Sequence, residues 1–191
     1  MRTIIIIIVG IVALSVPWHN VAAQEWKQNT QILPQYCQDR AKGTNSPEWK
    51  KWRSTFGEAY IHMHHYCSGV YAEHKAKVAI NQGEQKKWLG KVIHQMGYVG
   101  NHCNTSCVIY PELHTRLGWA LGETGQFSEA IKQFQLAIRA KPTYSLAYAR
   151  LSDLYIKYKQ PGEARKILEE GLKAKPESRK LQRLLRELDT E

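Results

Sequence analysis

The densest group of side chains able to do chemistry is the run His62-Met63-His64-His65-Tyr66-Cys67. If this run is helical, His62 and His65 lie three residues apart and share a face. Imidazole combined with thioether or thiolate sulfur suits copper or zinc. One hypothesis is therefore a metal-handling site on His62 and His65, completed by ligands from Met63, His94 or His102. The structural alternative is that His64 and Cys67 face the core, as a hydrogen-bonded histidine and a disulfide partner.

Four cysteines, Cys37, Cys67, Cys103 and Cys107, allow three disulfide pairings. An even number suits an exported chain with two disulfides. Local closure favours Cys103 with Cys107, which leaves Cys37 with Cys67. The second bond closes a loop of about 30 residues, worth roughly 3 to 4 kcal/mol in the chain-entropy model. The spacing of Cys103 and Cys107 differs from the two-residue interval of thioredoxin-like redox pairs, so we predict structural bonds.

Signatures of catalysis are absent from the sequence, which has no Gly-x-Ser-x-Gly, His-Glu-x-x-His, phosphate loop or Cys-x-x-Cys-His. Gly118, Gly122 and Gly125 resemble a glycine-rich loop only superficially, because Gly118 falls inside a predicted helix and Gly125 marks its turn. We therefore expect a binding protein without a cofactor, and not an enzyme.

The first 23 residues are typical of a secretory signal peptide. Arg2 is followed by an apolar run, Thr3–Val16, then by Pro17 and by the small residues Val21-Ala22-Ala23. Cleavage after Ala23 predicts a periplasmic or secreted protein with no membrane span left. The alternative is an uncleaved anchor, but fourteen helical residues cover about 21 Å of a roughly 30 Å hydrocarbon core.

The charge is basic and diffuse. Removing the leader, which carries Arg2, lowers the formal charge from +10 to +9. Residues 24–110 contain 11 Lys/Arg and 6 Asp/Glu, and residues 111–191 contain 15 and 11. Such a surface favours acidic protein partners, anionic membrane surfaces or cell-wall polymers. Export argues against a nucleic-acid partner.

Residues 24–110 are expected to form a helical head that contains the cysteines and most of the histidines. The polar stretch Gln24–Gln31 is expected to be poorly ordered. Leu33-Pro34 opens a short helix that Gly43 ends. Ser46-Pro47 then supplies an N-cap and a proline at the first position of the next helix.

The second half of the head reads as an αα-hairpin. Residues 57–81 are predicted to form one helix that stops at Gly83, with an alternating four-and-three seam of Tyr60, His64, Cys67, Tyr71, His74 and Val78. A helix over 84–99 presents Trp88, Val92, Met96 and Val99 along one face. An interruption, Gly100–Cys107, follows and contains Asn104-Thr105-Ser106, a glycosylation acceptor pattern if a eukaryote makes the protein.

From Pro111 onward the sequence repeats with a period of about 34 residues. Seven positions of the first unit match the second in class: Leu117, Gly118, Leu121, Ala130, Phe134, Ala137 and Pro142 pair with Leu151, Ser152, Tyr155, Ala164, Leu168, Gly171 and Pro176. Small residues stand where two helices must approach closely, and the prolines end each unit.

This pattern resembles the tetratricopeptide repeat. The first unit departs from that pattern at His114, and the second at Tyr148, Ser152 and Gly171, but none of these residues blocks the packing. The resemblance implies an all-α, right-handed αα-hairpin solenoid with units 111–144 and 145–178. Residues 179–191 read as a capping helix, with Leu181, Leu184, Leu185 and Leu188 on one face. The 57–99 hairpin is expected to stack on the helix at Pro111 as an irregular third layer.

The mature chain also resembles small exported bacterial proteins that join a Leu-Pro-x-Tyr-Cys and His-His-Tyr-Cys head to a tetratricopeptide tail. The matching elements are Leu33-Pro34-Gln35-Tyr36-Cys37 and His64-His65-Tyr66-Cys67. The resemblance implies a place in the bacterial envelope and brings no activity with it.

The resemblance further implies a groove lined by the first helix of each repeat. The predicted lining residues are Glu112, Thr115, Arg116, Trp119, Glu123, Leu146, Ala149, Arg150, Asp153 and Lys157. Arg116 and Arg150, one repeat apart, are candidates for a clamp on an acidic segment, and Trp119 for an aromatic anchor. The groups that hold a terminal carboxylate in chaperone-binding members are replaced here, at Thr115 and Ala149 among others, so that mode is not expected.

We therefore expect an exported scaffold that binds a protein or peptide, with a metal-handling protein as the alternative.

Overall fold

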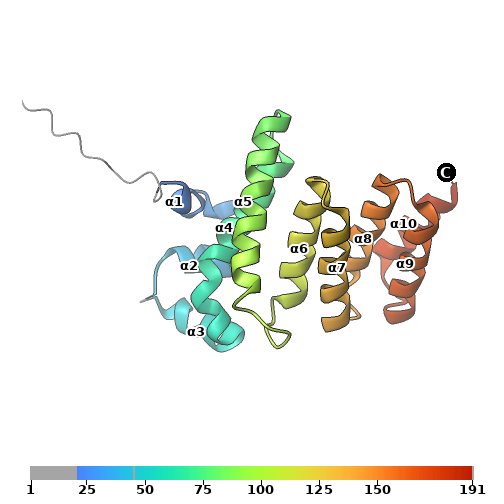
Figure 1. Ribbon diagram of the computed structural model, residues 1–191. Coiled ribbons are helices and arrows are strands. Elements are labelled where there is room, and N and C mark those ends of the chain that lie inside the picture. The colour runs from blue at the N-terminus through green and yellow to red at the C-terminus, as the bar shows by residue number, and fades with distance from the viewer. Residues whose placement is uncertain (1–20, 45, 191) are drawn as a thin grey trace, which may run out of the picture.

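The computed structural model describes residues 21–44 and 46–190, and every regular element of the described part is a helix (Figure 1). The predicted leader, residues 1–23, lies mostly outside the described residues, and helix α1 runs across its predicted cleavage point. No helix in the described ranges combines the length and the apolar character needed to cross a membrane. The elements are α1 (Val21–Gln28), a 3-10 turn (Thr30–Ile32), α2 (Gln35–Ala41), α3 (Pro47–Phe56), a 3-10 segment (Gly57–His62), α4 (Met63–Lys77), α5 (Gln82–Gly100), α6 (Tyr110–Glu123), α7 (Phe127–Ala140), α8 (Ser145–Lys157), α9 (Pro161–Ala174) and α10 (Arg179–Thr190).

The repeat region forms two helical hairpins, α6–α7 and α8–α9, as the period of the sequence predicts. Small residues permit the close approaches. A Cβ on Gly118 would meet the Phe134 ring at 3.0 Å and the Ala130 carbonyl oxygen at 3.1 Å. The prediction of an αα-hairpin solenoid is confirmed.

Helix α10 covers the open end of the stack. Leu181 is fully buried, and the other three leucines of its apolar face are partly buried against the core. Gly171 makes room for this contact, because a Cβ there would lie 2.7 Å from Leu181 Cδ1 and 2.8 Å from Tyr148 Cγ. Helix α10 therefore lies where a capping helix is expected.

Helices α4 and α5 form the third hairpin, and α5 packs on α6. The predicted face of α5, comprising Trp88, Val92, Met96 and Val99, is buried. Since this hairpin precedes the recognisable repeats and stacks on them, it is the expected extra layer.

The prediction of one helix over residues 57–81 was wrong at both ends. Residues Gly57–His62 form a 3-10 segment, and α4 ends at Lys77. Gly83 lies inside α5, whose N-cap is Asn81: its side chain accepts from the Glu84 backbone N–H at 2.8 Å. An asparagine cap that satisfies a free helix N–H starts the next helix two residues before the glycine. As a consequence, the buried face of this region differs from the predicted seam. His64 is only half-buried, and His74 and Val78 are exposed.

The N-terminal stretch was also predicted wrongly. Residues Gln24–Gln31 are ordered into α1 and the following turn, and Trp26 is 1% exposed. Helix α1 packs on α4, where the Tyr71 hydroxyl donates to Glu25 at 3.2 Å. The buried Trp26 and the Tyr71–Glu25 hydrogen bond together hold this polar segment on α4.

Both predicted disulfides are present. Cys37 of α2 is bonded to Cys67 of α4, and Cys103 to Cys107 in the connection between α5 and α6. The Ser46 side chain accepts from the Trp49 backbone N–H at 3.3 Å, which confirms the predicted cap of α3.

Candidate functional site

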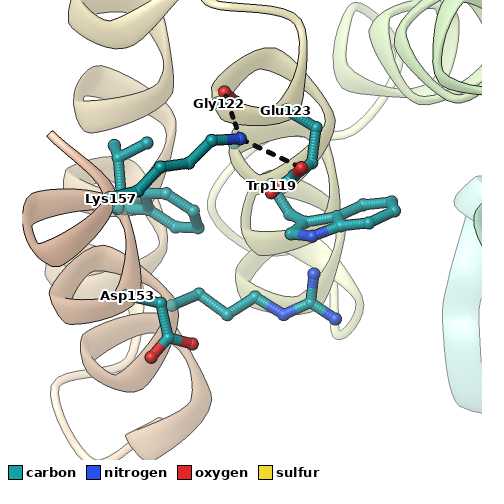
Figure 2. A pocket seen from close by; sticks show the side chains of 9 residues that line it. Trp119, Gly122, Glu123, Asp153 and Lys157 are labelled. Carbon is teal, nitrogen blue, oxygen red and sulfur yellow. Dashed lines mark hydrogen bonds and ion pairs between the residues drawn. The ribbon is translucent and has the colours of Figure 1, made fainter. Parts of the chain in front are cut away.

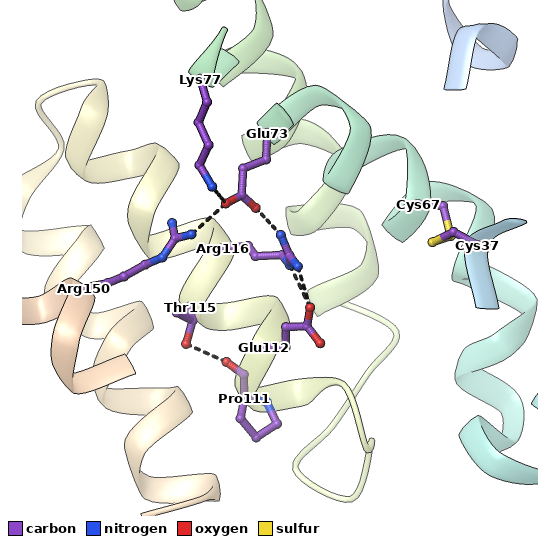
Figure 3. A network of polar contacts seen from close by, with 9 residues as sticks. All are labelled: Cys37, Cys67, Glu73, Lys77, Pro111, Glu112, Thr115, Arg116 and Arg150. Carbon is purple, nitrogen blue, oxygen red and sulfur yellow. Dashed lines mark hydrogen bonds and ion pairs between the residues drawn. A yellow bond between two sulfur atoms is a disulfide. The ribbon is translucent and has the colours of Figure 1, made fainter. Parts of the chain in front are cut away.

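The centre of one face is an ion network around Glu73 (Figure 3). Glu73 comes from α4, and its side chain is 2% exposed. Its carboxylate accepts from Arg116 of α6, from Arg150 of α8 at 2.8 Å and from Lys77, one turn along α4, at 2.5 Å. Arg116 also donates to Glu112, from Nη2 at 2.6 Å and from Nε at 3.0 Å. The network therefore joins three helices through one carboxylate.

The cations set the ionisation of this carboxylate. Burial alone raises the pKa of Glu73, but Arg116, Arg150 and Lys77 outweigh it and hold the pKa at about 2, against an ordinary 4.5. Burial likewise disfavours the charged form of Arg116, but the oxygens of Tyr66, Glu73 and Glu112 raise its pKa. Glu73 and Arg116 are therefore both charged at neutral pH.

The network also shows which side of the stack is concave. Glu73 on α4 and Arg150 on α8 are in hydrogen-bond contact although α6 lies between their helices in the stack. Side chains of helices two layers apart meet only on the inner side of a curve. The leading helices α4, α6 and α8 therefore line a concave groove.

A pocket of about 130 Å³ opens in this groove beside the network (Figure 2). Its walls are apolar and come from α6, α7 and α8: Gly118, Trp119, Gly122, Phe134 and Leu154. Its rim is polar, with Glu123, Arg150, Asp153 and Lys157. Lys157 donates to Glu123 at 3.0 Å and to the Gly122 carbonyl oxygen at 3.4 Å.

Trp119 stands between the pocket and the network. The Lys77 ammonium lies 5.0 Å and the Arg150 guanidinium 5.3 Å from its ring centroid. Such cation–π contacts orient an indole that is only half-buried. Arg150 Nη1 is buried and has no hydrogen-bond partner in the described part of the chain.

The structure separates the ten predicted groove residues into three sets. Glu123, Asp153 and Lys157 are exposed, and Glu112, Arg116, Trp119, Leu146 and Arg150 are half-buried. Thr115 and Ala149, in contrast, are fully buried, and the Thr115 hydroxyl donates to the Pro111 carbonyl oxygen at 2.8 Å. Helical phase placed these two at the groove, but close packing of α6 and α8 covers them.

The proposed clamp of Arg116 and Arg150 is occupied by the protein itself. The two arginines do converge, as their spacing of one repeat indicates, but on Glu73 and not on an open surface. Sequence reasoning missed Glu73 and Lys77. The available signal was weak: Glu73 is the only acidic residue in residues 63–77 and stands four residues before a lysine.

A second hollow, of about 400 Å³, continues the groove on the far side of the network. It lies between the segment Gln31–Pro34 and α4, with Val70, His74 and Lys77 along its wall. The groove therefore extends from the Trp119 pocket past Glu73 to the N-terminal segment.

The histidine run does not assemble a metal site. His62 lies against His102, with ring centroids 4.2 Å apart, and His65 lies against Tyr98 at 3.9 Å. The Nδ1 atom of His65 is 2.7 Å from Gln95 Oε1, and Cys67 is in a disulfide. No group of three or more His, Cys, Asp or Glu side chains in the described ranges is arranged to hold a metal ion. We therefore make no metal proposal for His62 and His65.

Residues 111–188 match the family described as tetratricopeptide repeat. Among solved structures, a thermophilic tetratricopeptide-repeat protein of Thermus thermophilus is similar, with 14% identity, a TM-score of 0.60, and coverage of 88% of this chain and 98% of that one. The first such domain of human RPAP3 is 20% identical, with a TM-score of 0.46 over 64% of this chain and 90% of that one. The first such domain of Spaghetti (RPAP3), bound to the HSP90 peptide SRMEEVD, is 20% identical, with a TM-score of 0.45 over 64% of this chain and 93% of that one. No curated protein matches the chain.

Proposed function

We propose that this chain, a tetratricopeptide-repeat protein by residues 111–188, is an exported adaptor that holds a peptide segment of a partner protein in its concave groove. The observation that carries the proposal is the pocket beside Trp119, with an apolar wall and a charged rim. Repeats of this family generally mediate protein–protein interactions. The proposal does not invoke catalysis.

The groove chemistry indicates how the partner would bind. The pocket volume of about 130 Å³ suits one apolar side chain, with the Trp119 ring as a wall. Because Glu73 and Glu112 already pair with Arg116 and Arg150, the groove does not depend on an acidic segment. We therefore propose an apolar anchor residue in an extended peptide as the recognised feature.

The cellular location is part of the proposal. The apolar run Thr3–Val16 and the small residues before Gln24 support export. Two disulfides agree with an oxidising compartment. We propose the bacterial cell envelope as the location; fractionation with mass determination of the mature N-terminus tests it, and a cytosolic chain starting at Met1 would contradict it.

The binding experiment compares capture of partners from the envelope fraction by matched variants. Trp119→Ala removes a pocket wall and should lower capture at least tenfold. Lys157→Glu reverses a charge at the rim and should also weaken capture. Lys132→Glu is its control, because Lys132 is also exposed and paired with a glutamate but lies on the outer helix α7. Equal capture by all variants would place the binding surface elsewhere.

A further inference from the structure

The connection between α4 and α5 presents aliphatic side chains to water. Val78 is 56% exposed. Ile80 is 91% exposed, which is the highest exposure of any large hydrophobic residue in the described chain. The hairpin projects beyond the neighbouring repeat helices, so this tip is at an edge of the molecule (Figure 1). An isoleucine that contributes nothing to the core, at the end of a projecting hairpin, indicates a contact outside the chain.

Lysines surround this tip. Lys75, Lys86 and Lys87 have no salt bridge with any described residue, whereas Lys77 is bound within the groove network. Glu84 is the one carboxylate in residues 74–91, and it is engaged locally with the Ile80 backbone N–H and Trp88 Nε1, both at 3.4 Å. The tip is therefore strongly positive.

Three lysine side chains of this region also converge on the ring of Trp88. The ammonium groups of Lys75, Lys87 and Lys91 lie 5.5, 5.6 and 5.1 Å from the Trp88 centroid. Burial lowers the pKa of Lys91; the Glu25 carboxylate opposes this shift, and the nearby Lys87 ammonium adds to it. Like charges gathered on one face repel one another, and an anionic surface relieves that repulsion.

The N-terminal end of the described chain lies on the same hairpin. Helix α1 packs on α4, and Tyr71, two turns before the tip, donates to Glu25 of α1. Lys27 in the last turn of α1 adds another positive charge. The chain that precedes α1 contains the apolar run Thr3–Val16. A leader joined to α1 would therefore continue from the helix that packs on this hairpin.

We propose that the α4–α5 tip docks on the surface of an anionic phospholipid bilayer. Val78 and Ile80 enter the headgroup region, and Lys75, Lys86 and Lys87 face the phosphates. A short aliphatic tip with a basic rim is the combination that holds a protein on an anionic surface without spanning it. This inference is independent of the groove function, because the Trp119 pocket is lined by residues of α6, α7 and α8 and by none of the α4–α5 tip.

The test is co-sedimentation of the exported chain with vesicles of phosphatidylglycerol and phosphatidylcholine in equal parts, and with phosphatidylcholine alone. All variants carry the same N-terminus, determined by mass. Wild type should partition to the anionic vesicles and lose binding at high salt. Lys86→Gln with Lys87→Gln should lower partitioning on the order of 30-fold. Val78→Ser with Ile80→Ser should lower it on the order of 10-fold.

Matched controls locate the surface. Lys141→Gln with Lys173→Gln removes two exposed lysines at the ends of α7 and α9, and Ile156→Ser changes a 40% exposed isoleucine of α8. Both should partition like wild type. The proposal is overturned if wild type does not prefer anionic vesicles, or if the control variants fall as far as the tip variants. Undiminished partner capture by the tip variants would separate this result from the groove function.

Discussion

Replacement of Glu73 by glutamine is the sharpest test of the reasoning, because one neutral, nearly isosteric change removes the charge that three cations share. In Glu73→Gln, Lys77 can turn to solvent and Arg116 keeps Glu112. Arg150, with 15% side-chain exposure, loses its anionic partner. A half-broken buried network costs more than the loss of a surface pair, since a charge is left without compensation.

The magnitude follows from the ionisation. A carboxyl with a folded pKa of about 2 and an ordinary pKa of 4.5 contributes about 3 kcal/mol through its charged form. Removal of one partner from a buried ion pair also costs roughly 3 to 5 kcal/mol. Because the folded pKa is depressed, this stability is fully present above about pH 5. It is lost as the pH falls from about 5 toward 2.

The assay is urea unfolding with intact disulfides, at pH 7 and at steps down to pH 2.5. Glu73→Gln should lower the free energy of unfolding by about 3 kcal/mol at pH 7, and the difference from wild type should shrink with acidification. Glu123→Gln is the control, since the Glu123–Lys157 pair is exposed to solvent and should change stability by less than about 1 kcal/mol. A Glu73→Gln variant as stable as wild type, or a pH-independent difference, would refute the role given to this carboxylate.

Three further results are expected. Gly171→Ala should lower the melting temperature by roughly 2 to 8 °C, because a Cβ there collides with α10 and α8. Gly162→Ala on the same helix is the control: its Cβ meets open space, so it should be neutral or stabilising. Equal effects of the two variants in thermal denaturation scans would contradict this packing. Replacement of Cys37 and Cys67 by serine should cost roughly 3 to 4 kcal/mol in urea unfolding, given the 30-residue separation of the pair, and an unchanged midpoint would count against it. The imidazole of His64 should titrate near pH 4 by NMR, because burial and the neighbouring His65 lower its pKa. Protonation of His64 then opposes folding, so this contribution to stability is lost as the pH falls from about 6.5 toward 4. An NMR pKa near 6.5 would exclude that environment.

Helix boundaries were predicted well where a local signal sets them. Ser46 with Pro47 starts α3, and the apolar spacing of Trp88 through Val99 identifies the buried face of α5. Capping and helical periodicity act over a few residues, so the sequence shows them directly. The prediction for residues 57–81 was wrong because apolar spacing alone does not reveal the 3-10 start or the Asn81 cap.

The groove was predicted only in part, because its ion network depends on contacts between residues that are far apart in the sequence. The repeat period placed Arg116 and Arg150 on one face, but nothing local connects either with Glu73, 43 and 77 residues away. That contact exists because the stack curves and brings α4 and α8 together over α6. The burial of Trp26 has a similar cause, since a polar segment becomes ordered only when another part of the chain offers a surface for it.

Residue type and spacing along the chain predict the helical class, the repeat and the capping helix. The same spacing leaves three cysteine pairings open, and it is the folded structure that brings Cys37 beside Cys67. The tertiary structure alone decided that the two groove arginines are neutralised internally, that Thr115 and Ala149 are covered, and that a pocket remains open beside Trp119. These properties depend on the curvature of the stacked helices. That curvature is the sum of small rotations between successive repeats, so no single segment of the sequence specifies it.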